Sequence, residues 1–207
     1  MKLCIFGETK DFDIAVYKAL VIKIFHECFG IENLSFHEPS FDPYGKGILL
    51  KQLALEIDLA SDTNSDLNFI FVFADSDDKS FEEQEREIDK LVRGKVKNFA
   101  YEAIIIAVPQ KNIEAWLLSD IGAINKTAGR KYKTMPEAEK IAKPKEKLRE
   151  IYGKEGKKTT YSKFALSIIE KINIDVLTKQ SKSFNSFHQK LISRIRQVSK
   201  ASSHIDH

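Results

Sequence analysis

The sequence has only two cysteines among its 207 residues, and no run of 18 apolar residues. Cys4 lies in an apolar, strand-like run and Cys28 on a helix face. Pairing is the alternative, but we expect two reduced thiols in the core. Without a long apolar run, no membrane-spanning helix is expected. The first residues, MKLCIFGETKDFD, also lack the apolar core of a secretory signal. We therefore expect a cytoplasmic protein with no membrane association.

Several familiar catalytic and binding patterns are also missing. There is no GxxxxGK[ST] loop, so the chain binds no nucleotide phosphate in that manner. The five histidines show no zinc-binding spacing with the two cysteines, and no GxSxG nucleophile elbow occurs. These absences leave acidic and basic side chains as the main carriers of chemistry.

Charge is divided unevenly along the chain. Residues 1–120 hold 13 Lys+Arg and 22 Asp+Glu, a net of −9, whereas residues 121–207 hold 20 and 8, a net of +12. Acidic groups attract metal ions and basic groups attract phosphates, so the two parts suggest two tasks. The alternative is that both are merely solvated faces.

Hydrophobic patterning predicts an α/β domain followed by a helical extension. The run LCIF is apolar at every position and NFIFVFA is apolar after its first residue, which is typical of parallel strands covered on both faces. Strands are expected at 2–6, 34–36, 68–74 and 103–108, and helices at 13–28, 48–60, 81–93 and 112–120. After residue 120 strand-like runs disappear, and helices are expected at 136–150, 162–172 and 185–199. We predict a sheet domain over 1–120 and a basic helical extension packed on it over 121–207.

The segment FADSDD places Asp75 and Asp77 just past the carboxyl end of a buried strand. Open α/β sheets bind ligands at that edge, and a spacing of two keeps both carboxylates on one side if the backbone stays extended. Two such carboxylates repel each other, and a hard cation such as Mg²⁺ relieves the repulsion. Asp78 either joins them or caps the next helix. The alternative is that all three simply cap and turn.

Two glutamates follow other strands of the predicted sheet. Glu8 lies in FGET, where Gly7 allows a sharp turn, and central parallel strands deliver such residues to one crevice. Its alternative is a loop or cap role. Glu114 lies in IEAWLLSD amid apolar residues, so it either reaches a site or hangs in solvent. Trp116 is expected in the core. Asp120, at a helix end where negative charge is unfavourable, hints weakly at a use.

The motifs FGET, FADSDD and IEAWLLSD together resemble the Toprim superfamily. More narrowly, the chain resembles the small Toprim proteins paired with AAA-type ATPases in abortive-infection phage-defence modules, including a YSK segment at 161–163 and an SF pair at 183–184. The resemblance spans most of the chain. It implies a four-stranded parallel Toprim core that binds Mg²⁺ or Mn²⁺, with Asp75 and Asp77 as the metal pair and Glu114 as the glutamate before the tryptophan.

One position departs from the pattern of that family. The usual first motif begins with glutamate, and Phe6 stands in its place. Glu8, two residues later, keeps the same side-chain direction in an extended chain and is the candidate substitute. The predicted metal ligands are therefore Glu8, Asp75 and Asp77, with Glu114 as a further catalytic group.

These observations lead to three functional hypotheses. The first is a metal-dependent nuclease acting on DNA or RNA, in which basic residues including Lys157, Lys158 and Lys163 hold the nucleic-acid backbone. The second is a non-catalytic subunit that regulates or docks on an AAA/ABC-type ATPase partner, which Phe6 favours. The third, a phosphoryl-transfer or nucleotide-processing enzyme that uses the same acids on a small substrate, is disfavoured by the +12 tail.

Overall fold

The computed structural model of the chain describes residues 1–39, 41, 43, 45–133, 135, 137–154 and 159–202. Its centre is a four-stranded sheet in the order β2-β1-β3-β4, in which every neighbouring pair is parallel. The strands are β1 (Lys2–Phe6), β2 (Ser35–His37), β3 (Leu67–Phe73) and β4 (Ile104–Ala107). The predicted α/β class with a parallel sheet between helices is confirmed. Within these described ranges, no helix has the length and apolar character needed to cross a membrane.

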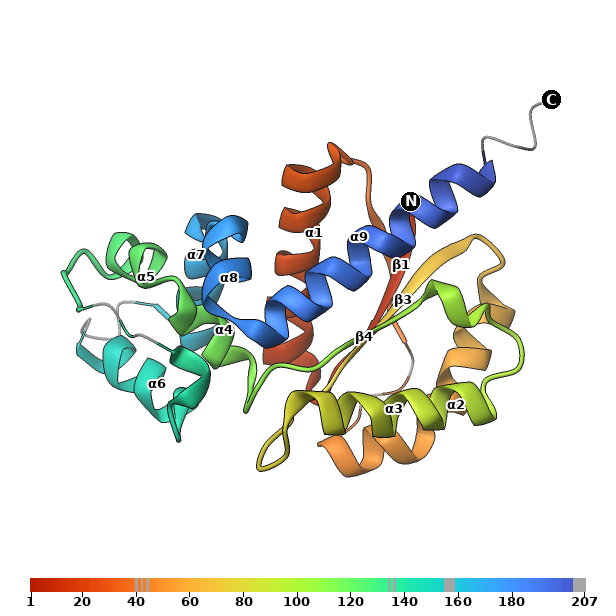
Figure 1. The fold of residues 1–207 in the computed structure, drawn as a ribbon, viewed down its shortest axis with the longest axis horizontal. Coiled ribbons are helices and arrows are strands. Elements are labelled where there is room, and N and C mark those ends of the chain that lie inside the picture. Colours follow the sequence, from red (N-terminus) through yellow and green to blue (C-terminus); the bar gives the residue numbers. More distant parts are fainter. Residues whose placement is uncertain are drawn as a thin grey trace.

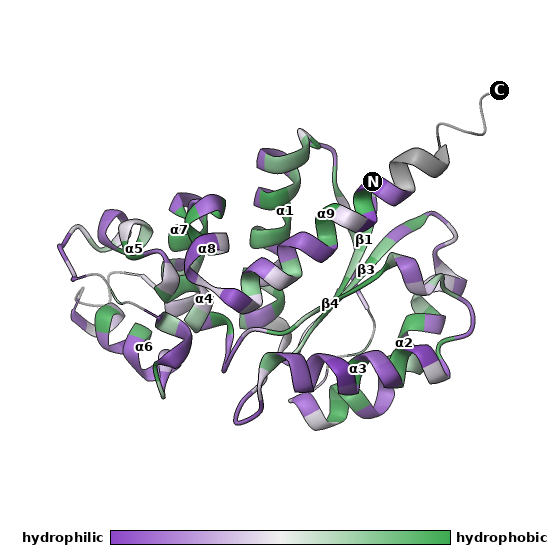
Figure 2. Ribbon diagram, in the orientation of Figure 1, coloured by the Kyte–Doolittle hydropathy of each residue, from purple (hydrophilic) through white to green (hydrophobic). Residues whose placement is uncertain are grey.

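Both faces of the sheet are covered, as the unbroken apolar runs predict. Alternate strand residues such as Phe69, Phe71 and Phe73 face α1 (Ala15–Phe29) and α9 (Lys182–Ser202). The intervening residues, such as Ile70 and Val72, face α2 (Lys46–Thr63) and α3 (Phe81–Lys95). Figure 1 shows these two helical layers on opposite sides of the strands, and Figure 2 shows how uniformly apolar the strands are.

A group of short helices lies at one end of the sheet (Figure 1). It consists of α4 (Ile113–Ser119), α5 (Ile121–Ala128), α6 (Pro144–Lys154), α7 (Tyr161–Lys171) and α8 (Ile174–Gln180). The 3-10 turns η2 (Tyr101–Ala103) and η3 (Ala138–Lys140) and the π-helical turn η1 (Lys10–Ile14) complete the elements. The core under α1 draws residues from both sides of position 120, from Leu3 to Ile195. The helical extension therefore shares its hydrophobic core with the sheet domain.

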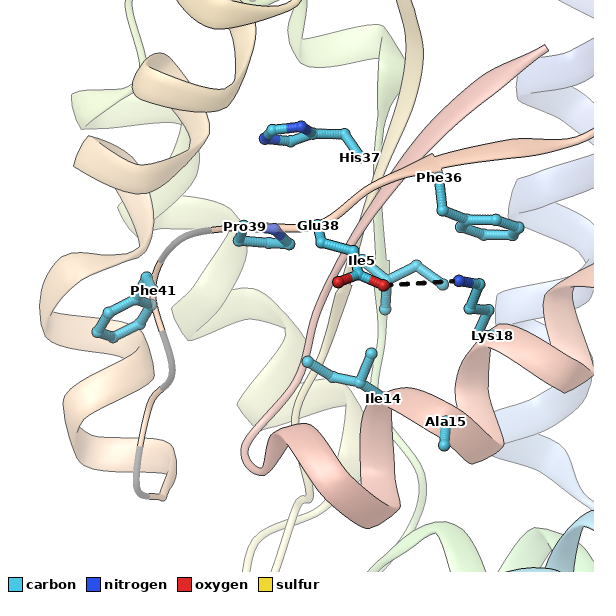
Figure 3. Close-up of a pocket in the computed structure, with 9 residues that line it drawn as sticks. All are labelled: Ile5, Ile14, Ala15, Lys18, Phe36, His37, Glu38, Pro39 and Phe41. Atoms are coloured by element: carbon cyan, nitrogen blue, oxygen red, sulfur yellow. Dashed lines mark ion pairs between the residues drawn. The ribbon is translucent and has the colours of Figure 1, made fainter.

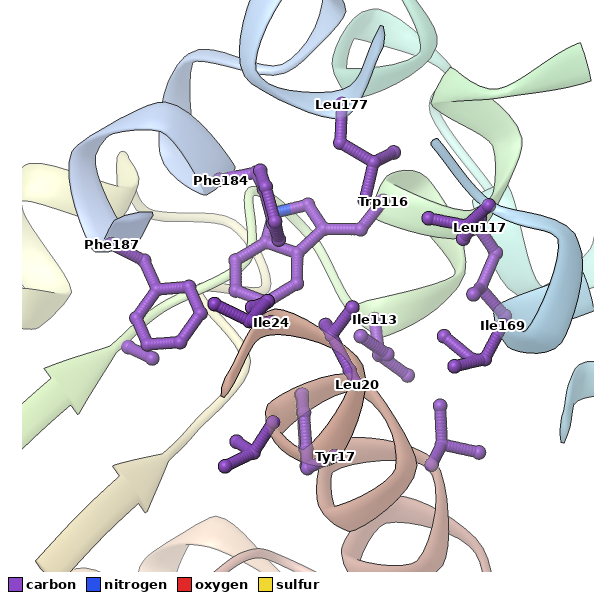
Figure 4. Close-up of a cluster of buried hydrophobic side chains, with 14 of the residues drawn as sticks. Tyr17, Leu20, Ile24, Ile113, Trp116, Leu117, Ile169, Leu177, Phe184 and Phe187 are labelled. Carbon is purple, nitrogen blue, oxygen red and sulfur yellow. The ribbon is translucent and has the colours of Figure 1, made fainter. Parts of the chain in front are cut away.

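Trp116 packs between the sheet domain and the helical extension (Figure 4). Its indole is fully buried, stacks on Phe187 at 5.7 Å between ring centroids, and meets Phe184 edge-on at 5.2 Å. Tyr17 of α1 meets it edge-on at 6.5 Å. Aromatic pairs at such distances add to the free energy of burial. The expectation that Trp116 belongs to the core is confirmed.

The helical extension departs from the pattern expected of it. A helix expected over 136–150 begins only at Pro144, since proline fits the first turn of a helix but not its interior. Helices α5 and α8 were not expected. Asp120 is explained by α5, because its carboxylate accepts hydrogen bonds from the backbone N–H groups of Ala123 at 3.0 Å and Asn173 at 2.9 Å.

The cysteine prediction is half right. Both thiols are free, and Cys4 is buried in the sheet. Cys28 is exposed, contrary to the expectation of a core thiol, and its sulfur lies 3.6 Å from Nε2 of His188. Cys28 therefore packs at the surface between α1 and α9.

The buried hydroxyl of Ser183 ties α9 to the loop after β4. Its Oγ accepts hydrogen bonds from Trp116 Nε1 at 2.7 Å and from the backbone N–H of Gln110 at 3.1 Å, and donates to the carboxylate of Glu139. The Ser183 backbone N–H also donates to Glu139, at 3.0 Å. One serine thus fixes three segments of chain.

We predict that Ser183→Ala lowers the free energy of unfolding by about 1–3 kcal/mol, because it leaves buried polar partners without their hydrogen bonds. Urea denaturation of both proteins measures the difference. Ser193→Ala, an exposed position on the same helix, is the control and should change stability by less than about 0.5 kcal/mol. Equal effects of the two substitutions would contradict the bridging role.

Candidate active site

The loop after β3 is held in one conformation by the loop after β4. Ser76 is fully buried, and its Oγ accepts hydrogen bonds from Lys111 N at 2.7 Å and Gln110 Nε2 at 3.2 Å. The Gln110 side chain also donates to Lys79 O at 3.0 Å and accepts from Phe81 N at 3.1 Å. The segment that carries the predicted metal pair is therefore rigidly placed at the carboxyl edge of the sheet.

Asp75 is the most strongly perturbed acid at this edge. Burial raises the pKa of its carboxyl well above the ordinary aspartate value, and the negative charges of Glu8, Asp13 and Glu114 raise it further. Its side chain receives one weak hydrogen bond, from the Tyr17 hydroxyl at 3.5 Å. A partly buried carboxylate with so little compensation from the described residues is typical of a functional site.

Glu8 lies beside Asp75. Its Oε1 accepts a hydrogen bond from the backbone N–H of Asp75 at 2.9 Å. Burial raises the pKa of Glu8, although that hydrogen bond and the nearby Lys46 oppose the rise. The structure thus brings together the two residues from neighbouring strands. Gly7, the residue before Glu8, allows the backbone to pack closely against Ile14, because a Cβ at this position would lie 3.2 Å from the Ile14 side chain.

Asp77 is oriented differently from Asp75. The backbone of Asp77 is left-handed, with φ of 52°, so the extended chain that was expected to align the two carboxylates is not present. Asp77 is consequently exposed, with 60% of its side chain accessible, and forms an ion pair with Lys46. Asp78 neither joins the acids nor caps α3. It is fully exposed, 3.6 Å from Lys111, and Ser80 is the cap.

Two further acids extend the cluster toward the helical part. Asp13 lies in the π-helical turn η1, a conformation frequent at functional sites, and accepts a hydrogen bond from Thr9 Oγ1 at 2.7 Å. Glu114, in the first turn of α4, is 1% exposed and accepts from the Tyr161 hydroxyl at 3.2 Å. Burial raises the pKa of both carboxyls. Glu114 therefore points inward and does not hang in solvent.

Basic and aromatic side chains of α6 and α7 border these acids. The positive charge of Lys145 acts on both Asp13 and Glu114 and partly opposes the rise in their pKa values. Tyr161 stacks on Phe12 at 5.1 Å, and the guanidinium of Arg149 lies 5.5 Å from the Tyr161 ring centre. Acids of the sheet thus meet bases of the helical extension.

The predicted phosphate-binding lysines are placed only in part. Lys163 is exposed in the first turn of α7, at a helix N-terminus suited to anions. Lys157 and Lys158 lie outside the described residues. Lys145 acts on the acids and Arg149 contacts Tyr161, and the sequence pattern singled out neither of them.

The residues at this edge have the ligand chemistry that a hard cation prefers, but their side chains are not arranged around a metal position. Their donors are carboxylate oxygens, which Mg²⁺ and Mn²⁺ prefer. Nevertheless, no three histidine, cysteine, aspartate or glutamate side chains in the described part of the chain converge closely enough to hold a metal ion. A divalent cation would require side chains to move, and Asp77, with an exposed side chain paired to Lys46, is the candidate.

An apolar cavity of about 210 Å³ lies beside the edge strand β2 (Figure 3). Ile5, Phe36 and Phe41 contribute to its wall, and Lys18 forms an ion pair of 4.0 Å with Glu38 at its rim. None of Glu8, Asp13, Asp75, Asp77 and Glu114 lines it. The cavity is therefore separate from the acidic edge.

Comparison with known proteins adds one family. The family described as a domain of unknown function, DUF4276, matches residues 18–192. The chain belongs to the DUF4276 family. No curated protein and no solved structure matches it. The DUF4276 match includes Lys46, Asp75, Asp77 and Glu114, and begins after Glu8. Membership assigns no activity to the acidic edge.

Besides Arg149, four residues of this edge escaped the sequence pattern. Asp13 and Tyr17 begin the first helix, and helical spacing marked Tyr17 only as apolar. Lys46 follows a glycine loop, and Lys145 belongs to a run of similar lysines. The usable signal was the acidic stretch ETKDFD directly after the first strand, which places Asp13 near the same edge as Glu8.

We predict that Asp75→Asn stabilises the metal-free protein at pH 7.5 by about 1–3 kcal/mol, because it removes a poorly compensated, partly buried charge. The folded pKa of Asp75 lies above the unfolded pKa. Its contribution to stability is thus full below the ordinary aspartate range and is lost as the pH rises through the folded pKa. The advantage of the variant should shrink as the pH falls toward about 4.

Urea denaturation with a chelator, repeated across this pH range, tests the effect. Asp78→Asn, at the fully exposed neighbour, is the control and should show little change at any pH. A uniform loss of stability in Asp75→Asn would mean that its carboxylate is well compensated in the fold.

Proposed function

We propose that the chain is a metal-dependent nuclease of Toprim type, acting on the phosphodiester backbone of DNA or RNA. The observation that carries the proposal is the partly buried carboxylate of Asp75, with Glu8, Asp13 and Glu114 around it, facing basic helices across one sheet edge. The parallel sheet with helices on both faces is compatible with a Toprim core. A role in phage defence beside an AAA/ABC-type ATPase follows from the sequence resemblance alone.

Glu8, Asp75 and Asp77 are the residues that would hold Mg²⁺ or Mn²⁺. When bound, such an ion supplies an activated water and neutralises charge on the scissile phosphate. Glu114 is suited to proton transfer, because burial raises its pKa toward the operating pH and the Tyr161 hydroxyl fixes one of its oxygens. The Tyr17 hydroxyl contacts the Asp75 carboxylate at 3.5 Å, and the Asp13 carboxylate adds to the local negative potential.

The basic residues of α6 and α7 would hold the nucleic-acid backbone. Lys145, Arg149 and Lys163 are all exposed, and Tyr161 presents an aromatic ring between them and the acids. Contacts of this kind are independent of base sequence. They would place a phosphate over Glu114 and Asp75, so that the helical extension supplies binding and the sheet supplies chemistry.

A second candidate is a non-catalytic subunit of an ATPase complex. Phe6 occupies the position of the usual motif glutamate and is buried in the core at 2% exposure, so it supplies no ligand. The lack of converging acids in the described residues agrees with that reading. The two candidates differ in one property. A nuclease cleaves nucleic acid when the metal is present, whereas a non-catalytic subunit does not.

We predict that the wild-type protein binds Mn²⁺ and, with the metal, cleaves plasmid DNA or RNA. Glu8→Gln should reduce cleavage by a factor of about 100 or more, because it removes a charge from the site while keeping size and polarity. Asp75→Ala/Asp77→Ala should abolish both Mn²⁺ binding and cleavage. Calorimetry and a gel assay, with and without a co-purified ATPase, measure the two properties.

The matched control is Asp62→Ala/Asp66→Ala, which removes two exposed charges just before β3, at the opposite end of that strand. It should bind and cleave as the wild type does. Metal binding without cleavage under every partner condition would favour the regulatory subunit. Equal Mn²⁺ binding by both double variants would rule out the predicted metal pair.

We predict that affinity for nucleic acid falls steeply with salt, because phosphate contacts release counterions. Lys145→Glu/Arg149→Glu should weaken binding. It should also make the slope of log K against log salt shallower by about two, one for each phosphate contact that is lost. Lys163→Glu, and Lys157→Glu/Lys158→Glu outside the described residues, test the lysines predicted from sequence. Fluorescence anisotropy at several salt concentrations gives the slopes.

Lys95→Glu/Lys97→Glu, on the far side of the sheet domain around the end of α3, is the control for total charge. Binding that does not respond to salt, or that weakens equally in the control, would assign the basic extension to an acidic protein partner instead.

A further inference from the structure

Lys46 directs its ammonium into the acidic edge. Its Nζ donates a hydrogen bond to the backbone carbonyl of Asp75 at 3.1 Å and forms an ion pair with Oδ2 of Asp77. The side chain is largely covered, with 22% of it exposed. Its charge also acts on the Glu8 carboxylate. One cation is thus shared by the three residues that the proposed function assigns to the metal.

The position of Lys46 is unfavourable for a lysine except for these contacts. It is the first residue of α2, where the helix dipole disfavours positive charge. Gly45 precedes it with φ of 99°, a conformation that favours glycine, and the Gly45 N–H donates to Glu8 O at 3.0 Å. The backbone that starts α2 is therefore anchored on Glu8, which brings Lys46 to the acids.

The oxygens around this ammonium are those that a hard divalent cation takes as ligands, namely a carboxylate and a backbone carbonyl. Two cations cannot share them, because like charges at such distances repel strongly in a partly buried site. The lysine stem is long and flexible and starts at the surface end of the helix, so the ammonium has solvent to move into.

We propose that Lys46 is the resident counter-cation of the metal-free site, and that Mg²⁺ or Mn²⁺ binds by displacing its ammonium from Asp75 and Asp77. This inference rests on the proposed metal site and deepens it. It accounts for the acids that fail to converge on a metal position in the described residues, since the ammonium already occupies the oxygens of Asp75 and Asp77 that a metal would take. Lys46 sets both the affinity of the site and its stability without metal.

Two variants isolate the effect. Lys46→Gln keeps a donor and much of the length but removes the charge, and Lys51→Gln makes the same change at an exposed position of the same helix. Mn²⁺ titration calorimetry should give a dissociation constant about fivefold lower for Lys46→Gln than for Lys51→Gln, as expected from removing a partly exposed ion pair. Lys46→Met, the second variant at this position, should bind Mn²⁺ as tightly as Lys46→Gln does.

Thermal denaturation provides a readout independent of catalysis. Without metal, Lys46→Gln should melt below Lys51→Gln, because its acids have lost their counter-cation. Saturating Mn²⁺ should raise the melting temperature of Lys46→Gln by more than that of Lys51→Gln, since ligand binding stabilises in proportion to its affinity.

The possible outcomes separate this inference from the function on which it rests. Equal or weaker Mn²⁺ binding in both Lys46 variants, relative to Lys51→Gln, would overturn the displacement role while leaving the metal site standing. Absence of Mn²⁺ binding in the wild type and in every variant would overturn the metal site itself. Tighter binding by Lys46→Gln, together with the larger thermal shift, supports displacement.

Discussion

Burial of negative charge at one sheet edge is the constraint on which the rest of this structure depends. From Phe69 onward strand β3 is apolar on both faces, so the chain meets no further polar position until it reaches Asp75, at the point where neighbouring strands end. Glu8 arrives there from β1 and Glu114 from the segment after β4. Carboxylates placed this way lose water and repel each other, and their pKa values rise for that reason. A fold rarely retains such unfavourable groups without a use for them.

The edge is held together by a chain of hydrogen bonds that runs through both halves of the molecule. Glu139 accepts from Ser183, Ser183 accepts from Trp116 and Gln110, and Gln110 braces the loop that carries Asp75. Apolar packing alone would fix the helices but not this loop, because its backbone polar groups need partners. The position of the acids is therefore set in part by the helical extension, although its residues lie far away in sequence.

Much of the fold could be predicted from the sequence, because continuous apolar runs and helical spacing report directly on burial. The strands and α1 to α4 fall within a few residues of their predicted bounds. The helical extension was less predictable: Asp120 looked like a misplaced charge because its role as the cap of α5 depends on a helix with little periodicity. Glu8, Asp75 and Glu114 were identifiable as residues that follow strands. Lys46 was not, since a lysine after a glycine loop has no local pattern that reveals a distant carboxylate.

The uneven charge along the chain takes on a physical meaning at this edge. A phosphate approaching the acids alone would be repelled, whereas Lys145 and Arg149 supply attraction from the adjoining helices. The acids without a cation would repel one another, whereas Lys46 supplies a positive charge from within the sheet domain. Each half of the chain thus carries charge that the other half or an internal partner offsets. Under the proposed function, a movable internal cation and exposed external ones would keep the acids folded when metal is absent and would leave them able to bind it when it is present.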